Sequence, residues 1–220
     1  MTETAARAAR AVLFDLDGTL LDTRDLILGS FKHAFAEVLG EAPPDDEMLD
    51  LVGIPLPDQM RHFSPQHADD LVAAFRKHTD EVHDRQVRSF AGVTEALTTL
   101  RAAGLRLAVV TSKRHALAWR GLKVFGLERF QEFLIGADDC PEHKPRPGAL
   151  LLAAERMKLA PADCVYVGDS PYDMQAANSA QMLAVGALWG MFTEQRLIEA
   201  GAKLCAARPA ELPEMLGVVS

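Results

Sequence analysis

The chain has 220 residues, of which 49% are hydrophobic and 25% are charged, and its net charge at pH 7 is −8. This composition predicts one globular domain, or one domain with a modest insertion, and the negative charge argues against a general nucleic-acid binder. No apolar run approaches the roughly 20 residues that span a bilayer, so we expect no membrane segment, and residues 1–10 lack the apolar stretch of a secretory signal. Three cysteines without metal-type spacing favour a reduced, cytoplasmic setting.

The first part of the chain predicts one strand followed by a helical unit. Residues 11–14 form a short apolar run that is typical of a buried strand. Hydrophobic residues then recur at helical spacing, and Asp22 or Thr23 is placed to cap the first helix. We expect the stretch 53–57, which contains two prolines, to be a stiff loop. We therefore predict an all-helical insertion, residues 22–86, with helices over 23–39, 44–53 and 64–86.

After the insertion, the pattern changes to alternating strands and helices. This alternation predicts an α/β fold, in which helices cover both faces of a parallel sheet. Residues 1–21 and 87–220 are accordingly assigned to the sheet domain. The predicted strands are 105–110, 133–136, 164–167, 182–185 and an edge strand at 203–206, and the predicted helices include 92–103, 115–125 and 147–158.

Two aspartates leave the first strand two residues apart. In an extended chain the side chains of Asp15 and Asp17 fall on the same side, and such close carboxylates raise each other's pKa unless a cation compensates. Oxygen ligands without sulfur favour Mg2+. A carboxylate beside a metal ion can attack phosphorus, and its neighbour can donate a proton. The same pattern is also typical of an ordinary polar turn, so the motif alone leaves both interpretations open.

Polar residues also follow later strands of the predicted sheet. Thr111 and Ser112 follow one strand, and Asp169 and Asp173 follow another. In an open parallel sheet, ligands bind outside the carboxyl ends of the strands. We therefore expect these residues and the two N-terminal aspartates to converge on one site.

Chemistry assigns a role to each candidate in this site. Asp15 would attack phosphorus, while Asp17 would protonate the leaving oxygen and then activate water. Thr111 would hydrogen-bond the phosphoryl oxygens, and Lys144, in a loop stiffened by prolines, would supply a cation near the phosphate. The candidate Mg2+ ligands are Asp15, Asp17, Asp169 and Asp173.

These motifs resemble, in order and spacing, the four motifs of the haloacid dehalogenase superfamily. They are Asp15-x-Asp17-Gly18-Thr19, a strand that ends in Thr111, Lys144-Pro145, and Gly168-Asp169-x-x-x-Asp173. The resemblance covers essentially the whole chain and is greatest to the phosphoglycolate phosphatase and bacterial pyrophosphatase branch. It implies a Rossmann-like three-layer core with a small, mobile helical cap. Because the dehalogenases themselves lack the second aspartate and the metal, Asp17 argues for phosphoryl transfer.

The resemblance also implies how the site is assembled. Mg2+ would be held by Asp15, the main-chain carbonyl of Asp17, and Asp169, and Asp173 would support it directly or through water. Ser112 stands where many relatives carry asparagine, which bears on specificity. The loop at Gly53 aligns with the cap loop that reaches into the site. The candidate substrate-binding residues are Gly18, Thr19, Gly53, Ser112 and Lys113.

We therefore predict a Mg2+-dependent phosphatase that acts on a small phosphorylated metabolite through an aspartyl-phosphate on Asp15. Phosphoglycolate is the first expected substrate and inorganic pyrophosphate the second. Two other classes stay open: a sugar-phosphate mutase of the same superfamily, and a binding protein that keeps the fold without turnover. The sequence leaves the oligomeric state, monomer or dimer, undecided.

Overall fold

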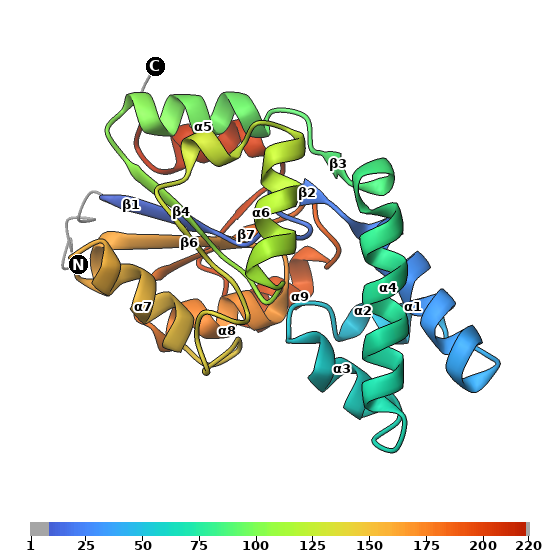
Figure 1. The fold of residues 1–220 in the computed structure, drawn as a ribbon. Helices are drawn as coiled ribbons and strands as arrows, with labels where there is room; N and C mark the ends of the chain where they lie inside the picture. The colour runs from blue at the N-terminus through green and yellow to red at the C-terminus, as the bar shows by residue number, and fades with distance from the viewer. Residues whose placement is uncertain (1–8, 219–220) are drawn as a thin grey trace.

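The computed structural model of the protein describes residues 9–218. Most of residues 1–10, where we expect no secretory signal, therefore lies outside the described residues. A six-stranded parallel sheet forms the centre, in the order β5-β4-β1-β6-β7-β8 (Figure 1). Its strands are β1 (Ala11–Phe14), β4 (Arg106–Val110), β5 (Leu134–Ile135), β6 (Cys164–Gly168), β7 (Leu183–Ala187) and β8 (Leu204–Ala206).

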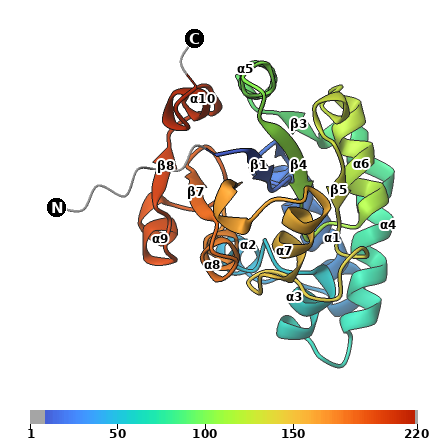
Figure 2. The same cartoon turned by 90° about the vertical axis from the view of Figure 1, so that its left-hand side faces the viewer.

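Alternate residues of each strand pack into hydrophobic clusters on opposite faces of the sheet. In β1, Ala11 and Leu13 belong to one cluster, and Val12 and Phe14 belong to the other. Helices α7 and α8 pack on the first face, and α5 and α6 pack on the second, so the sheet lies between two helical layers (Figure 2). The predicted α/β fold is confirmed. The bounds of these helices are α5 (Val93–Ala102), α6 (His115–Val124), α7 (Gly148–Arg156) and α8 (Pro171–Ser179).

The C-terminal part of the chain completes both layers. After β7, helix α9 (Glu194–Glu199) packs Leu197 into the cluster of α7 and α8. After β8, helix α10 (Leu212–Met215) packs Leu212 beside α5. Among residues 9–218, no helix combines the length and the apolar character that crossing a membrane would require.

Four helices between β1 and β4 form a body with a hydrophobic cluster of its own. They are α1 (Arg24–Leu39), α2 (Asp45–Asp50), α3 (Leu56–Phe63) and α4 (Ala68–Gln86), and they lie together at one end of the sheet (Figure 1). Phe31 and Phe35 of α1 pack with Leu71 of α4 in this cluster. The chain leaves and re-enters the sheet domain through a short antiparallel pair, β2 (Leu21–Asp22) and β3 (Arg88–Ser89).

Two details of the helical segment differ from the prediction. The stretch 53–57 is not entirely a loop, because α3 begins at Leu56 with Pro57 in its first turn. Proline is compatible with that position, since the first amides of a helix have no partner within it. Helix α4 begins at Ala68 rather than at Ser64. The division into a cap, residues 22–86, and a core stays a prediction.

Candidate active site

The main chain places the first candidate residues at one edge of the sheet. The amide of Asp15 donates to the carbonyl of Val167 at 2.9 Å, and the amide of Thr111 donates to the carbonyl of Ile135 at 2.9 Å. These bonds continue the parallel ladders one residue beyond β1 and β4. The sheet therefore fixes the backbone of both residues at its carboxyl edge, where Asp169 follows β6.

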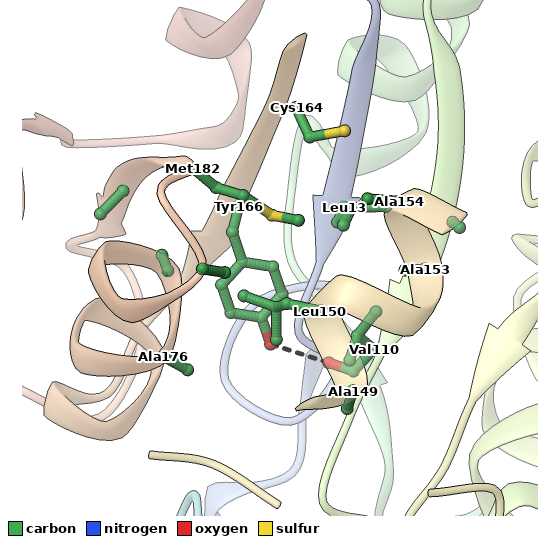
Figure 3. Close-up of a cluster of buried hydrophobic side chains, with 14 of the residues drawn as sticks. Leu13, Val110, Ala149, Leu150, Ala153, Ala154, Cys164, Tyr166, Ala176 and Met182 are labelled. Carbon is green, nitrogen blue, oxygen red and sulfur yellow. Dashed lines mark hydrogen bonds between the residues drawn. The ribbon is translucent and has the colours of Figure 1, made fainter. Parts of the chain in front are cut away.

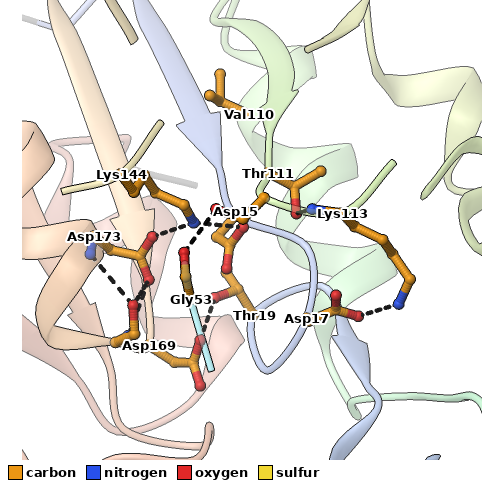
Figure 4. A network of polar contacts seen from close by, with 12 residues as sticks. Asp15, Asp17, Thr19, Gly53, Val110, Thr111, Lys113, Lys144, Asp169 and Asp173 are labelled. Atoms are coloured by element: carbon orange, nitrogen blue, oxygen red, sulfur yellow. Dashed lines mark hydrogen bonds and ion pairs between the residues drawn. The ribbon is translucent and has the colours of Figure 1, made fainter. Parts of the chain in front are cut away.

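Three carboxylates and one ammonium group meet at this edge (Figure 4). Asp15, Asp169 and Asp173 each offer an oxygen, and these oxygens lie within 4.8 Å of one another. The Nζ atom of Lys144 lies 2.9 Å from Oδ1 of Asp15 and 2.6 Å from Oδ1 of Asp173. All four side chains are buried. The cluster therefore holds three acidic groups and one ammonium group away from water.

Burial sets the protonation of this cluster. Desolvation raises the pKa of Asp15 to about 7, although Lys144 opposes this shift. Desolvation also raises the pKa of Asp169 well above its ordinary value, and the neighbouring Asp173 adds to the effect. For Lys144, desolvation lowers the pKa, but Asp15 and Asp173 more than offset it, so its pKa is raised and the amine stays protonated.

A cation fits the carboxylates of this cluster. Oδ1 of Asp15 is buried, and its one close polar contact is the ammonium of Lys144 at 2.9 Å. The carboxylates of Asp15 and Asp169 therefore present oxygens that a divalent ion could bind, which would also remove the repulsion between them. The donor set contains only oxygen, as hard cations prefer.

The carboxylate of Asp173 is already occupied by protein donors. Its Oδ1 accepts from Lys144, and its Oδ2 accepts from the amide and the hydroxyl of Ser170 at 2.9 and 2.6 Å. In return, the hydroxyl of Ser170 accepts from the amide of Asp173, which completes a capping box at the start of α8. Asp173 thus anchors Lys144 and this helix end together.

The second N-terminal aspartate lies to the side of the cluster, on the wall of the cavity that Asp15 also lines (Figure 4). Oδ1 of Asp17 lies 2.7 Å from Nζ of Lys113, and both side chains are largely buried. Figure 4 shows this pair to the side of the group formed by Asp15, Lys144 and Asp173. The hydroxyl of Thr111 accepts from the amide of Lys113 at 3.3 Å, so it orients the start of the segment that carries this lysine.

Gly18 and Thr19 contact Asp169. The Oγ1 of fully buried Thr19 lies 3.5 Å from Oδ1 of Asp169. Gly18 has φ +79°, and a Cβ there would lie only 2.1 Å from an oxygen of Asp169. A Cβ on Gly190 would lie 2.2 Å from the Cβ of Asp169, and the next amide, of Met191, donates to this carboxylate at 2.8 Å. The glycines therefore allow the main chain to enclose Asp169, and substrate contacts by Gly18 and Thr19 stay a prediction.

A cavity opens between this edge and the helical segment. Its volume is about 110 Å³, and its walls include Asp15, Asp17, Thr111, Lys144 and Asp169. Further lining residues come from the helical segment, from the loop after β4 and from the start of α6: Ile27, Val52, Gly53, Ile54, Phe75, Arg76, Ser112, Lys113, Arg114 and Leu117. The carbonyl of Gly53 accepts from the hydroxyl of Ser112 at 2.6 Å. This bond joins two predicted substrate-binding residues across the boundary of the segment.

Sequence reasoning missed Tyr166, a fully buried residue of β6 (Figure 3). Its hydroxyl donates to the carbonyl of Val110 at 2.8 Å and lies 3.2 Å from Oδ1 of Asp173. It thus supports the floor of the acidic cluster. The available signal was a single hydroxyl-bearing residue in an otherwise apolar strand, since a buried tyrosine requires a hydrogen-bond partner.

Comparisons with known proteins agree with this arrangement. Residues 12–187 match the family of haloacid dehalogenase-like hydrolases. A protein of Caldanaerobacter subterraneus, provisionally named pyrophosphatase PpaX, is 39% identical over 181 residues, which are 82% of each chain. Pyrophosphatase PpaX of Halalkalibacterium halodurans is 36% identical over 77% of this chain and 79% of its own. A crystal structure from Lactobacillus plantarum, provisionally named phosphoglycolate phosphatase, has a TM-score of 0.86 at 25% identity and covers 95% of this chain and 100% of its own.

Proposed function

This chain belongs to the haloacid dehalogenase-like hydrolases and is a phosphatase of that family, and we propose that it hydrolyses a small phosphorylated metabolite through an aspartyl-phosphate on Asp15. The observation that carries this proposal is the position of Asp15. Its carboxylate lines the cavity and lies 2.9 Å from the buried ammonium of Lys144. A nucleophile and a phosphate-binding cation are thus fixed side by side.

We assign the proton transfers to Asp17. In the first step an oxygen of Asp15 forms a bond to phosphorus, the bond to the leaving oxygen breaks, and Asp17 gives that oxygen a proton. In the second step Asp17 takes a proton from water, whose oxygen attacks phosphorus and releases Asp15. Lys144 and Thr111 stabilise the phosphoryl oxygens in both steps. Lys113, paired with Asp17 at 2.7 Å, holds its carboxylate at the cavity wall.

We propose Mg2+ as the metal. Asp15, Asp169 and the main-chain carbonyl of Asp17 would hold it, while Asp173 acts behind them through its bonds to Lys144 and Ser170. When bound, Mg2+ supplies positive charge that offsets the excess of carboxylates and the charge of the phosphoryl group.

We further propose that residues 22–86 form a cap over a core made of residues 1–21 and 87–220. The cluster of hydrophobic residues within α1–α4 gives this segment its own interior. The contact of Gly53 with Ser112 supports a role for the α2–α3 loop in closing the cavity over the substrate.

The comparisons support two candidate substrates. Phosphoglycolate is supported by the fold shared with the Lactobacillus plantarum protein, and inorganic pyrophosphate by the PpaX relatives, whose identity to this chain is higher. Both are small molecules that carry a second anionic group besides the transferred phosphoryl group, whereas a cavity of about 110 Å³ leaves little room for a macromolecule.

Phosphate release from a substrate panel tests the proposal. The panel contains phosphoglycolate, pyrophosphate, hexose phosphates and nucleotides, each assayed with Mg2+ and with EDTA. We expect Mg2+-dependent turnover, with one small substrate about 100-fold above the others in kcat/KM. Interconversion of hexose phosphates without phosphate release would identify a mutase instead. Absence of turnover on every substrate would favour a binding protein.

A further inference from the structure

Helix α4 presents one cation to the cavity. Phe75, Arg76 and Thr79 of this helix line the same cavity as Asp15 and Lys144. Thr79 donates its hydroxyl to Ser30, so it is already satisfied within the helical segment. Arg76 is therefore the charged residue of α4 that lines the cavity and can contact a bound ligand.

Arg76 differs from the other cations of the cavity in having no carboxylate partner. Lys144 pairs with Asp15 and Asp173, Lys113 pairs with Asp17, and Arg114 lies 3.6 Å from Asp80. For Arg76, the described residues provide neither a hydrogen bond nor an ion pair, and its Nε atom is buried without an acceptor. A buried donor left unpaired costs about 1–3 kcal/mol, so the fold retains one unsatisfied guanidinium donor, the Nε–H of half-buried Arg76, at this wall.

The surroundings of Arg76 favour an anion. Desolvation and the neighbouring Arg114 lower its pKa, while Asp80 and Asp138 oppose this shift. A guanidinium nevertheless stays protonated at neutral pH. An anionic group in the cavity would supply the missing acceptor and reduce the repulsion between the two arginines.

The wall of this cavity is mostly apolar. It includes Ile27, Val52, Ile54 and Leu117. A ligand that spans the cavity therefore meets strong polar anchors at the acidic cluster with Lys144, and at the arginine of α4.

We propose that Arg76 binds a second anionic group of the substrate, so that this enzyme selects small phosphate compounds that carry a terminal phosphate or a carboxylate besides the transferred phosphoryl group. This inference rests on the proposed phosphatase function. It makes Arg76 a substrate-binding residue that determines specificity. A phosphate ester whose leaving group is uncharged has no second anion for Arg76 to bind, and therefore gains no affinity from this residue.

Matched variants and matched substrates test this role. Arg76→Gln removes the guanidinium, and Lys77→Gln removes one positive charge from the adjacent, exposed position of the same helix. Each is assayed with pyrophosphate, with phosphoglycolate, and with 2-hydroxyethyl phosphate, which replaces the carboxylate by an alcohol. We expect Arg76→Gln to lower kcat/KM about 10- to 100-fold for whichever of the first two the wild type hydrolyses, mainly through KM. Turnover of 2-hydroxyethyl phosphate, and all rates of Lys77→Gln, should stay within about threefold of wild type.

An equal loss on all three substrates, or no loss on any, would overturn the role of Arg76. A second readout does not depend on turnover. In the Asp15→Asn background, calorimetry with Mg2+ present compares the binding of pyrophosphate and of inorganic phosphate. Arg76→Gln should weaken pyrophosphate binding at least tenfold and leave phosphate binding unchanged. If the wild type hydrolysed nothing, the proposed function would fail, and the binding difference would still decide whether Arg76 recognises a second anion.

Discussion

Asp15 is held in the folded chain at an energetic disadvantage. Its pKa is raised to about 7, chiefly by desolvation, so its ionised form is less stable in the folded than in the unfolded state. Such destabilisation of a charged group is common at functional sites, where a bound ion or the reaction relieves it. In the metal-free protein, this destabilisation should be measurable as a change in the free energy of unfolding when Asp15 is replaced.

Asp15→Asn should therefore have opposite effects on activity and stability. We expect Mg2+-dependent turnover to fall by at least about 1,000-fold, because the nucleophile is lost. In EDTA at pH 8, removing the buried charge should stabilise the fold by about 2 kcal/mol, or roughly 4–8 °C in Tm. Phosphate release and thermal unfolding measure these effects. Asp25→Asn, on the exposed face of α1, is the control and should change neither. Unchanged turnover in Asp15→Asn would exclude the covalent mechanism.

Lys144 balances two of the buried carboxylates. Lys144→Met leaves Asp15 and Asp173 without their ion pairs, so we expect a loss of about 3–5 kcal/mol at pH 8. At pH 5 the loss should be smaller, because Asp15 is then below its raised pKa and is protonated. Chemical unfolding at both pH values measures the difference. The control is Lys123→Met, which removes an exposed lysine of α6. An equal loss at pH 5 and pH 8 would show that Lys144 stabilises through packing rather than charge.

At the scale of elements, the loop between α2 and α3 connects the helical segment to the acidic cluster. Gly53 has φ +119°, and a Cβ there would lie 2.7 Å from Oγ of Ser170 and 2.9 Å from Cδ2 of Tyr172. The carbonyl of Gly53 also accepts from Ser112. The loop therefore packs closely on two strand-end segments that carry candidate site residues.

Gly53→Ala should separate the effect of this close packing from that of backbone strain. The added methyl group would push the loop away from Ser170, so we expect kcat/KM to fall at least about tenfold, with a stability loss of about 1–3 kcal/mol. Gly40→Ala is the matched control, since Gly40 has φ +88° but a Cβ there would meet nothing within 4 Å. It should lose about 1–2 kcal/mol of stability and keep wild-type kinetics. Equal kinetics in the two variants would argue against a role for the loop contact.

The loop between α2 and α3 also marks a limit of predicting secondary structure from this sequence. The strands and most helices of the sheet domain were predicted within one to three residues, because apolar runs and glycine stops mark them. Helix α3 was missed, because Pro55 and Pro57 suggested a loop although proline also suits the first turn of a helix. Local sequence cannot separate these two possibilities, since packing against α4 decides between them.

At the scale of the molecule, sheet topology explains why the candidate residues could be found without a structure. Residues that end β1, β4 and β6 must meet at one edge, because these strands are parallel neighbours. The contacts within that edge were not predictable. The pairing of Asp17 with Lys113, the orientation of Thr19 toward Asp169 and the presence of Arg76 in the same cavity as Lys144 depend on side-chain packing between distant segments.

Four groups with shifted pKa values, Asp15, Asp169, His78 and His83, contribute to the pH dependence of stability. In the metal-free protein, the raised pKa values of Asp15 and Asp169 mean that the folded state binds more protons than the unfolded state above about pH 4. Asp15 therefore makes stability fall as pH rises from about 4 to 7, and Asp169, whose pKa is also raised, acts in the same direction. His78 and His83 act oppositely, because desolvation lowers their pKa values and their contribution to stability rises with pH up to about 6.5.

A double variant isolates the acidic cluster from these histidines. The variant that combines Asp15→Asn with Asp169→Asn keeps both histidines, so subtracting its free energy of unfolding from that of the wild type cancels their contribution. In EDTA, this difference should become steadily more negative between pH 5 and pH 8. Because Mg2+ binds the ionised carboxylates, its stabilising effect on the wild type should be larger at pH 8 than at pH 5, and absent from the variant. Thermal unfolding at three pH values, with and without Mg2+, gives all of these quantities. A difference in unfolding free energy that stays constant with pH would mean that Asp15 and Asp169 do not bind protons in this range. An equal Mg2+-induced increase in Tm for both proteins would mean that the metal binds elsewhere.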